Sequence, residues 1–112
     1  MSELLNERCD ACRADAPRVE EPECKVLLQQ LDGWQLIEQE GVAQLLKVYE
    51  FGNFVDALAF TQQVGGLAEQ EGHHPALLTE WGRVTVRWWT HKIRGLHRND
   101  FIMAAKTDDI AN

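Results

Sequence analysis

The stretch GLAEQEGHHPALLTEWGRVTVRWWTH, residues 66–91, decides the fold of this chain. Its first part completes a helical pattern that ends at Gly72, a residue type typical of helix C-termini. Alternating side chains follow, and they predict a hairpin with strands at about Leu77–Trp81 and Val84–His91. His73-His74-Pro75 lies between the two patterns, and a proline does not continue a helix. The chain is therefore predicted to change from helix to antiparallel sheet at the two histidines.

A long helix is predicted before this turn, beginning after Asn53, which is a favourable N-cap residue. One face of the helix is formed by residues at helical spacing: Phe54, Ala57, Leu58, Thr61, Val64, Leu67 and Ala68. Within the helix, Gly65-Gly66 costs about 1 kcal/mol per glycine relative to alanine. We expect a close approach of the helix to the sheet to be the reason for these glycines.

The N-terminal half predicts a similar succession of helix and hairpin. Pro22 suits the first turn of a helix, which Asp32-Gly33 ends. Strands at Trp34–Glu38 and Ala43–Phe51 follow, and a closing helix is predicted from Asn99-Asp100 onward. The order α-β-β-α-β-β-α predicts an α+β fold: a four-stranded antiparallel sheet with helices packed on one face.

The length of 112 residues fits one domain. Residues 1–20 mix charge and alanine without a period and predict a loosely ordered N-terminal extension, so that residues 21–112 form the domain. Cys9 and Cys12 form a Cys-x-x-Cys pair in this extension. A structural zinc site needs four ligands and no second pair exists, so these cysteines are predicted to be free thiols.

Composition and charge limit the partners of the chain. No apolar run approaches the ~20 residues of a membrane helix, so we expect a cytoplasmic protein without membrane contact. The formal net charge is −7, whereas direct binding to nucleic acid needs a concentrated basic surface. A mild basic excess near the histidines suits a small anionic or polar ligand better than duplex DNA: Arg83, Arg87, Lys92, Arg94 and Arg98.

The second predicted strand carries apolar side chains on both of its faces. A sheet covered by helices on one side needs only one such face. Tyr49, Phe51 and Trp89 are assigned to the second face, where they would be exposed in a monomer. This pattern predicts that another subunit covers the face, as in a homo-oligomer.

Histidines and carboxylates cluster around the helix-to-sheet turn: Glu69, His73, His74, His91 and Asp100. Imidazole titrates near neutral pH, so the cluster suggests proton transfer or metal binding, although scattered surface histidines are the simpler alternative. Three histidines with Glu69 are a plausible set of metal ligands. Adjacent histidines seldom face one ion, however, and the usual i, i+4 pair is missing, so no metal is predicted. Asp100 is expected to cap the last helix more than to hold the loop that carries His91.

Written out, the cluster is E-x3-H-H-P-x5-W-x9-H-x8-D, from Glu69 to Asp100. This pattern resembles the signature of the pterin-4a-carbinolamine dehydratases, also known as dimerization cofactors of a homeodomain transcription factor. Phe51-Gly-Asn-Phe54 and Gly95-Leu96 extend the resemblance. The run Trp88-Trp89-Thr90-His91 is similar to bacterial members encoded alongside phenylalanine hydroxylase. His97 stands where the family often has serine or threonine, so the cap of the last helix is expected to differ.

The resemblance implies dehydration of 4a-hydroxytetrahydrobiopterin (pterin-4a-carbinolamine) to quinonoid dihydropterin and water, which recycles the cofactor of phenylalanine hydroxylase. It assigns catalysis to His73, His74 and His91, with Glu69 and Asp100 in support and Glu69, Pro75 and Trp81 at the substrate. It implies no cofactor, a homodimer or tetramer, and phenylalanine hydroxylase or a regulator protein as a partner. The alternative function is a protein-binding transcriptional coactivator, or dimerization module.

The implied chemistry suits these residue types. Loss of water requires an acid that protonates the departing hydroxyl and a base that removes the proton from N5. Neither step needs a metal or a covalent intermediate. A positioned imidazole contributes about 10²–10⁴-fold to such a transfer.

Overall fold

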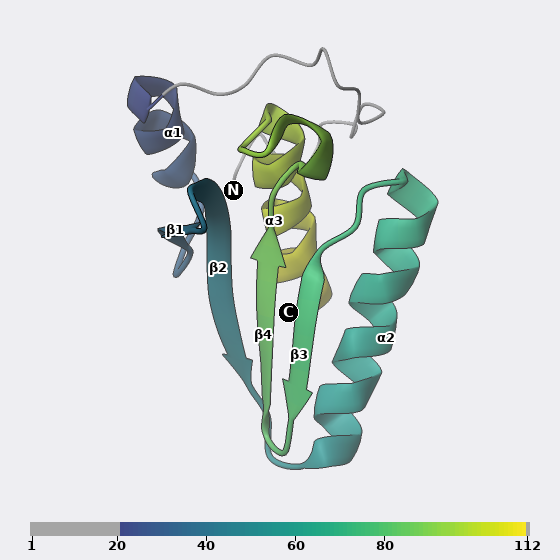
Figure 1. The fold of residues 1–112 in the computed structure, drawn as a ribbon. Helices are drawn as coiled ribbons and strands as arrows, with labels where there is room; N and C mark the ends of the chain where they lie inside the picture. Colours follow the sequence, from purple (N-terminus) through teal and green to yellow (C-terminus); the bar gives the residue numbers. More distant parts are fainter. Residues whose placement is uncertain (1–20, 112) are drawn as a thin grey trace.

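The computed structural model describes residues 21–111 of the chain. Its elements are α1 (Glu21–Leu28), β1 (Gln35–Gln39), β2 (Val42–Glu50), α2 (Phe54–Glu71), β3 (Ala76–Glu80), β4 (Arg83–Trp88), the 3₁₀ turn η2 (His91–Ile93) and α3 (Arg98–Ala111). Apart from the short η2, this is the predicted order (Figure 1). The predicted N-terminal extension and the two cysteines in it, Cys9 and Cys12, lie outside the described residues.

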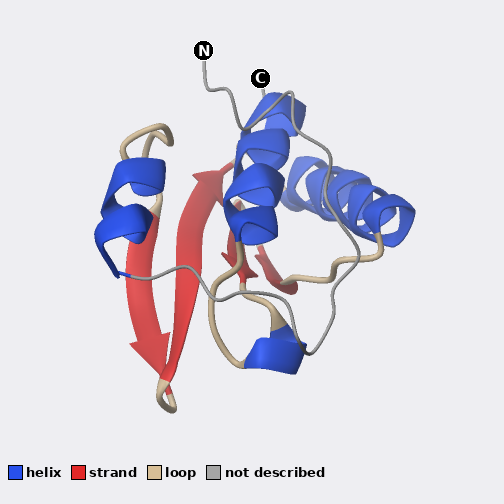
Figure 2. Cartoon of the chain, turned by 90° about the horizontal axis from the view of Figure 1, so that it is seen from above, coloured by secondary structure: helices blue, strands red, loops and turns tan. Residues whose placement is uncertain are grey.

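The four strands form one antiparallel sheet in the order β1-β2-β4-β3. The β1–β2 hairpin turns through Glu40 and Gly41, which both have positive φ, 55° and 79°. Two such residues make the tight turn whose twist matches that of the flanking strands. The helices α2 and α3 lie side by side on one face of the sheet (Figure 2). The predicted fold class is therefore confirmed.

The hydrophobic core lies between the sheet and the helices, and it includes residues of α1. Among its fully buried side chains are Leu45 of β2, Trp88 of β4, Val64 of α2 and Phe101 of α3. Burial of an aliphatic or aromatic side chain of this size contributes about 1.5–3 kcal/mol. The alternation along β4 directs Val84, Val86 and Trp88 into this core, which fixes the register of the strand.

The two ends of α2 form as the sequence predicts. The side-chain oxygen of Asn53 accepts a hydrogen bond from the backbone N–H of Asp56, at 2.7 Å. Gly72 has the left-handed conformation, with φ of 67°, and its N–H binds the carbonyls of Ala68 and Glu69. The C-terminal cap turns the chain directly into His73-His74-Pro75.

The expectation that Gly65 and Gly66 allow a close approach of α2 to the sheet is wrong. A Cβ atom added at either position would meet no atom within 4 Å, so neither glycine allows a close contact with the sheet. The Gly66→Ala variant is therefore expected to raise the free energy of unfolding by about 0.5–1 kcal/mol, because alanine restricts the unfolded chain. Urea denaturation of this variant and the wild type measures the difference. A loss of stability would show that the glycine has another role.

The expectation that Tyr49 and Phe51 lie on the second face of the sheet, the open face that no described helix covers, is also wrong. Both rings contact Phe60 of α2, at centroid distances of 4.7 and 5.2 Å, so both lie on the helix side. The open face instead carries Val48 and Leu78, which are 42% and 57% exposed and flank Thr85 of β4 in the sheet register. Self-association through this face stays a prediction.

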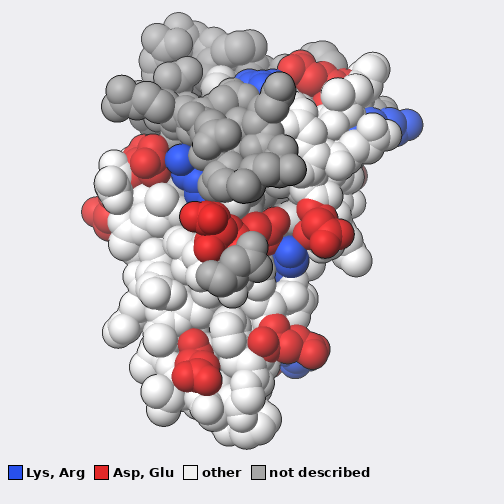
Figure 3. Space-filling view, turned by 180° about the vertical axis from the view of Figure 1, so that it is seen from behind, with Lys and Arg blue, Asp and Glu red and all other residues white. Residues whose placement is uncertain are grey.

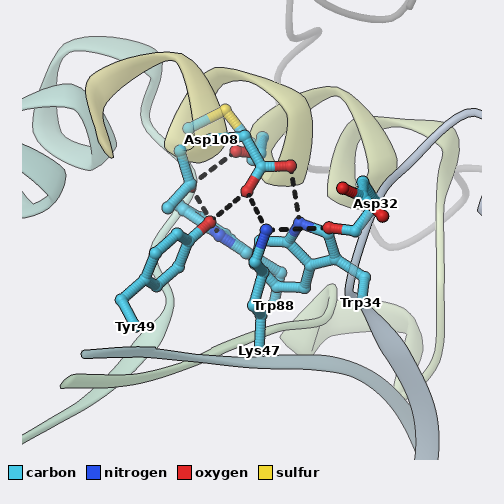
Figure 4. A network of polar contacts seen from close by, with 8 residues as sticks. Asp32, Trp34, Lys47, Tyr49, Trp88 and Asp108 are labelled. Carbon is cyan, nitrogen blue, oxygen red and sulfur yellow. Dashed lines mark hydrogen bonds and ion pairs between the residues drawn. The ribbon is translucent and has the colours of Figure 1, made fainter. Parts of the chain in front are cut away.

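Asp108 of α3 lies at the centre of a polar network beside the core (Figure 4). Its carboxylate accepts hydrogen bonds from Trp34 Nε1 at 3.0 Å, from Lys47 Nζ at 2.9 Å and from the Tyr49 hydroxyl. Lys47 also donates to the backbone carbonyl of Asp32 at 2.7 Å. Burial, the hydrogen bond to Asp108 and the negative charge of Asp108 raise the pKa of Tyr49. The network joins α3 to β2 and to the segment between α1 and β1.

Loss of this carboxylate is expected to destabilise the fold. The Asp108→Ala variant should lose about 2–4 kcal/mol of unfolding free energy, because it leaves partly buried donors without their acceptor. The neighbouring Asp109 is exposed, and the Asp109→Ala variant is a matched control with an expected change within about 0.5 kcal/mol. Urea titrations followed by tryptophan fluorescence compare the two. Equal midpoints would contradict the role of the network.

Candidate active site

His73 is buried, with only 2% of its surface exposed. Its Nε2 atom lies 2.6 Å from Oδ1 of Asp100, which is 0% exposed. Its ring stacks on Trp88, with a centroid distance of 5.6 Å and an interplanar angle of 9°. The first histidine of the pair is thus held between the end of the sheet and the start of α3.

Asp100 connects three segments of the chain. Besides His73, it receives hydrogen bonds at Oδ2 from the Thr90 hydroxyl, at 2.8 Å, and from the backbone N–H of His97, at 2.9 Å. The last bond is half of a capping box, and the bond from Thr90 holds the residue before His91, so Asp100 makes the contacts of both roles that the sequence offered as alternatives. The His97 ring completes the cap, because its Nδ1 accepts from the N–H of Asn99 at 3.0 Å. His97 thereby replaces the hydroxyl of a serine or threonine cap.

His74 points to a different carboxylate from His73. Its Nε2 atom lies 2.7 Å from Oε2 of Glu69, in the last turn of α2. Both side chains are exposed. An exposed pair of this kind adds less than about 1 kcal/mol to stability. Its effect is to orient the imidazole of His74.

His91 begins η2 and is exposed, so β4 does not extend to His91 as predicted. The strand ends at Trp88 because Thr90 pairs with Gly95 and bends the chain around η2. The ring of His91 lies 4.3 Å from that of Trp89, centroid to centroid. Thr90 binds the same carboxylate as His73, so His91, the next residue, lies at the same end of the sheet. The sequence pattern also predicts that His73, His74 and His91 line one cleft, and this stays a prediction.

Pro75 and Trp81 lie at opposite ends of β3. Pro75 directly precedes the strand and is half-buried, next to the paired histidines. Trp81 is 73% exposed in the β3–β4 turn, at the far end of the sheet (Figure 1). A strand of five residues spans about 17 Å at ~3.3 Å per residue. The structure therefore does not bring Trp81 to the cluster within one chain.

Thr90 and Trp88 are parts of the site to which the sequence pattern assigned no role. The hydroxyl of Thr90 and the ring of Trp88 hold the Asp100–His73 pair. The signal available in the sequence was their position, directly before His91 in the Trp88-Trp89-Thr90-His91 run.

The described residues offer no cluster of metal ligands. Among residues 21–111, no group of three or more histidine, cysteine, aspartate or glutamate side chains has the arrangement needed for an ion. The geometry gives a reason, because His73 and His74 bind separate carboxylates. Within the same range, no helix has both the length and the apolar character needed to cross a bilayer.

Comparisons with known proteins identify relatives that match nearly the whole chain. A provisionally named pterin-4-alpha-carbinolamine dehydratase of Marinobacter nauticus is 60% identical over 110 residues, which cover 98% of this chain and 99% of the relative. A relative with the same name from Saccharophagus degradans is 56% identical, over 98% of this chain and 97% of its own length.

Similarity extends to a solved structure, described as a transcriptional coactivator/pterin dehydratase from Brucella melitensis. It has a TM-score of 0.77 and 33% identity, and the match covers 86% of this chain and 100% of that one. The family model of pterin 4 alpha carbinolamine dehydratase matches residues 17–110. This chain therefore belongs to the pterin 4 alpha carbinolamine dehydratase family.

Proposed function

We propose that this chain removes water from 4a-hydroxytetrahydrobiopterin and releases quinonoid dihydropterin, so that the cofactor of phenylalanine hydroxylase is recycled. Membership of the dehydratase family supports this reaction. The observation that carries the proposal is that adjacent histidines, His73 and His74, are hydrogen-bonded to separate carboxylates at one end of the sheet. A pair arranged in this way presents one imidazole to solvent and keeps the other as part of the scaffold.

The proton transfers are assigned to His74 and His91, because both are exposed and can reach a substrate. We assign the Nε2–H tautomer to His74, so that Glu69 accepts its hydrogen bond and the lone pair of the ring lies on Nδ1. Nδ1 of His74 is then oriented to accept the proton from N5. His91, in its protonated form, gives a proton to the departing 4a-hydroxyl. After one turnover the two histidines exchange protons with solvent.

His73 and Asp100 are assigned a positioning role. The buried pair joins the turn before β3 to the end of β4 and to α3, and so fixes the distance between His74 and His91. A displacement of about 1 Å between reacting groups can cost about 10²-fold in rate. Glu69 and Pro75 are retained as residues next to the substrate. Trp81 is not, because it lies at the far end of β3.

Stopped-flow measurement of carbinolamine dehydration tests the reaction. The wild type, with a chelator present, is expected to exceed the uncatalysed rate and to retain its rate when the chelator is omitted. The His74→Ala/His91→Ala double variant, shown to be folded by circular dichroism, is the matched control and should approach the background. A wild-type rate equal to the background would refute the enzymatic function.

A protein-binding function is the second candidate, and exposed apolar residues of α2 favour it. Phe54, Val55 and Leu58 lie in the first turns of this helix with exposed side chains. Apolar groups gathered in this way are typical of protein contacts. We propose a cytoplasmic homodimer or tetramer that contacts phenylalanine hydroxylase or a regulator protein. Light scattering at tens of micromolar distinguishes an oligomer from a monomer.

A further inference from the structure

A pocket of about 280 Å³ lies at the end of the sheet where β4 leads to His91. Its walls come from the β1–β2 hairpin, from the end of β4 and from the residue after η2. The side chains that matter are Gln39, Glu40, Gln44, Arg87, Trp89 and Arg94. This volume is at the lower limit of ligand pockets, so it suits a small group and not a whole cofactor.

Arg87 is held in a fixed position in this pocket. Its Nη1 atom donates to the side-chain oxygens of Gln39, at 2.6 Å, and of Gln44, at 3.1 Å. The guanidinium group also lies 5.5 Å from the centroid of the Trp89 ring. Among the described residues, these contacts use one of its nitrogen atoms as a donor and leave the others to bind a ligand. A guanidinium group fixed in this way loses little entropy when it binds an anion.

Arg94 has a backbone conformation that its residue type rarely adopts. Its φ is 49°, in the left-handed region, where it ends η2. A residue with a Cβ atom pays about 1–2 kcal/mol for this conformation, and glycine or asparagine adopts it more readily. Strain of this kind is typical of functional sites, where a side chain is needed in spite of the cost. Here the strained residue adds a second cation to the pocket of Arg87.

Trp89 connects this pocket to the candidate active site. One contact of its ring is with Arg87, and another is with the imidazole of His91, at 4.3 Å. A ligand group in the pocket would therefore contact the same Trp89 ring that the proposed acid contacts. Two arginines at one pocket are unusual in this chain, because its formal net charge is −7. On the face shown in Figure 3, acidic groups lie beside the few basic ones over the described surface.

We propose that this pocket binds a phosphate or carboxylate group between Arg87 and Arg94, beside the Trp89 ring that contacts His91. The proposal rests on the proposed function, since it extends the site of the same reaction. The anion is either a substituent on the side chain of the pterin or a separate small anion. Arginine pairs bind such groups through charge-assisted hydrogen bonds. Glu40 also lines the pocket, and its carboxylate weakens anion binding without cancelling the two positive charges.

Calorimetric titration with two dihydropterins tests the proposal without turnover. One dihydropterin carries a phosphate on its side chain and the other is the same compound without the phosphate. We expect the phosphorylated compound, or inorganic phosphate alone, to bind in a manner that depends on both arginines. A preference of at least about tenfold for the phosphorylated compound would show that the bound anion is a substituent on the side chain of the pterin. Binding of inorganic phosphate without this preference would identify a separate anion.

Variants separate this role from a structural one. Arg94→Asn should lose the phosphate-dependent binding at least about tenfold while the melting temperature stays equal or rises, because asparagine tolerates a positive φ. Arg87→Gln should lose the same binding. Arg94→Lys keeps the charge and should retain part of the binding, and Glu40→Gln should strengthen it severalfold.

Two results would overturn the proposal. One is equal affinity of the two dihydropterins together with no binding of inorganic phosphate. The other is a phosphate preference that persists in both Arg87→Gln and Arg94→Asn. Neither result depends on dehydratase activity, so failure of this inference is distinguishable from failure of the proposed function.

Discussion

Replacement of His74 by alanine is expected to lower turnover by about 10²–10⁴-fold, the contribution of one positioned imidazole to proton transfer. The side chain is exposed and bound to the exposed Glu69, so its loss should change the stability of the fold by less than about 1 kcal/mol. The effect should appear mainly in kcat, because the proton is transferred only in the transition state. Stopped-flow kinetics of the folded variant measure kcat and KM.

His97 supplies the control for this experiment. Its side chain has neither a catalytic nor a positioning role in the proposed site, and it caps α3 through Nδ1. The His97→Ser variant keeps a side-chain acceptor at the N-cap and is expected to retain turnover within about a factor of two of the wild type, since serine is a preferred cap. If His74→Ala and His97→Ser had the same turnover, the assignment of proton transfer to His74 would be wrong.

Replacement of Asp100 by alanine is expected to lower the free energy of unfolding by about 3–5 kcal/mol, because it leaves three buried or partly buried groups without their hydrogen-bond partner. The size follows from the burial of the carboxylate and from its contacts with His73, Thr90 and His97. This exceeds the roughly 1 kcal/mol of a helix cap alone, since the bonds to His73 and Thr90 are lost as well. Guanidinium denaturation measures the change.

The Asp100→Asn variant refines this expectation. Asparagine keeps one acceptor oxygen, and the other position becomes a donor that faces the hydroxyl of Thr90 or the ring of His73. A neutral His73 can accept from that donor, so the loss is expected to be about 1–3 kcal/mol, the cost of an imperfectly satisfied buried group. A loss below 0.5 kcal/mol for Asp100→Ala, about that of an ordinary surface change, would contradict the scaffold role.

The order of elements and the caps of α2 could be predicted from the sequence because their signals are local. Asn53 and Gly72 act within one helical turn of their own positions, and the alternation in Val84–Trp88 records which side of the strand meets the core. Such signals depend on the neighbouring residues alone. For this reason the element order is correct even where strand limits differ by a residue or more.

The positions of Tyr49 and Phe51 could not be predicted, because they depend on partners distant in the sequence. The hydroxyl of Tyr49 binds Asp108, and both rings pack on Phe60 of α2. A mixed apolar and polar strand gives no local signal for which face the helices cover. The surroundings of Gly65 and Gly66 in α2 could not be predicted for the same reason, because a helical glycine can face either a neighbouring element or open space.

The arrangement of the candidate site also depends on contacts between distant parts of the sequence, and so it could be predicted only in part. The pattern from Glu69 to Asp100 identified the paired histidines and their carboxylates, yet it gave equal weight to Trp81, at the far end of β3. It also did not distinguish the buried His73 from the exposed His74. Burial depends on how the turn, β4 and α3 meet at Asp100, and sequence spacing contains no information about that junction.

A crystal structure with bound dihydropterin tests the proposed site most directly. The account predicts that N5 of the pterin lies within hydrogen-bonding reach of His74, about 2.6–3.2 Å or through one water, with His91 on the side of the C4a position. His73 should remain bound to Asp100 in that structure. A pterin ring bound against Trp81, or beyond about 6 Å from both His74 and His91, would lie outside the reach of any proton transfer and would contradict the account.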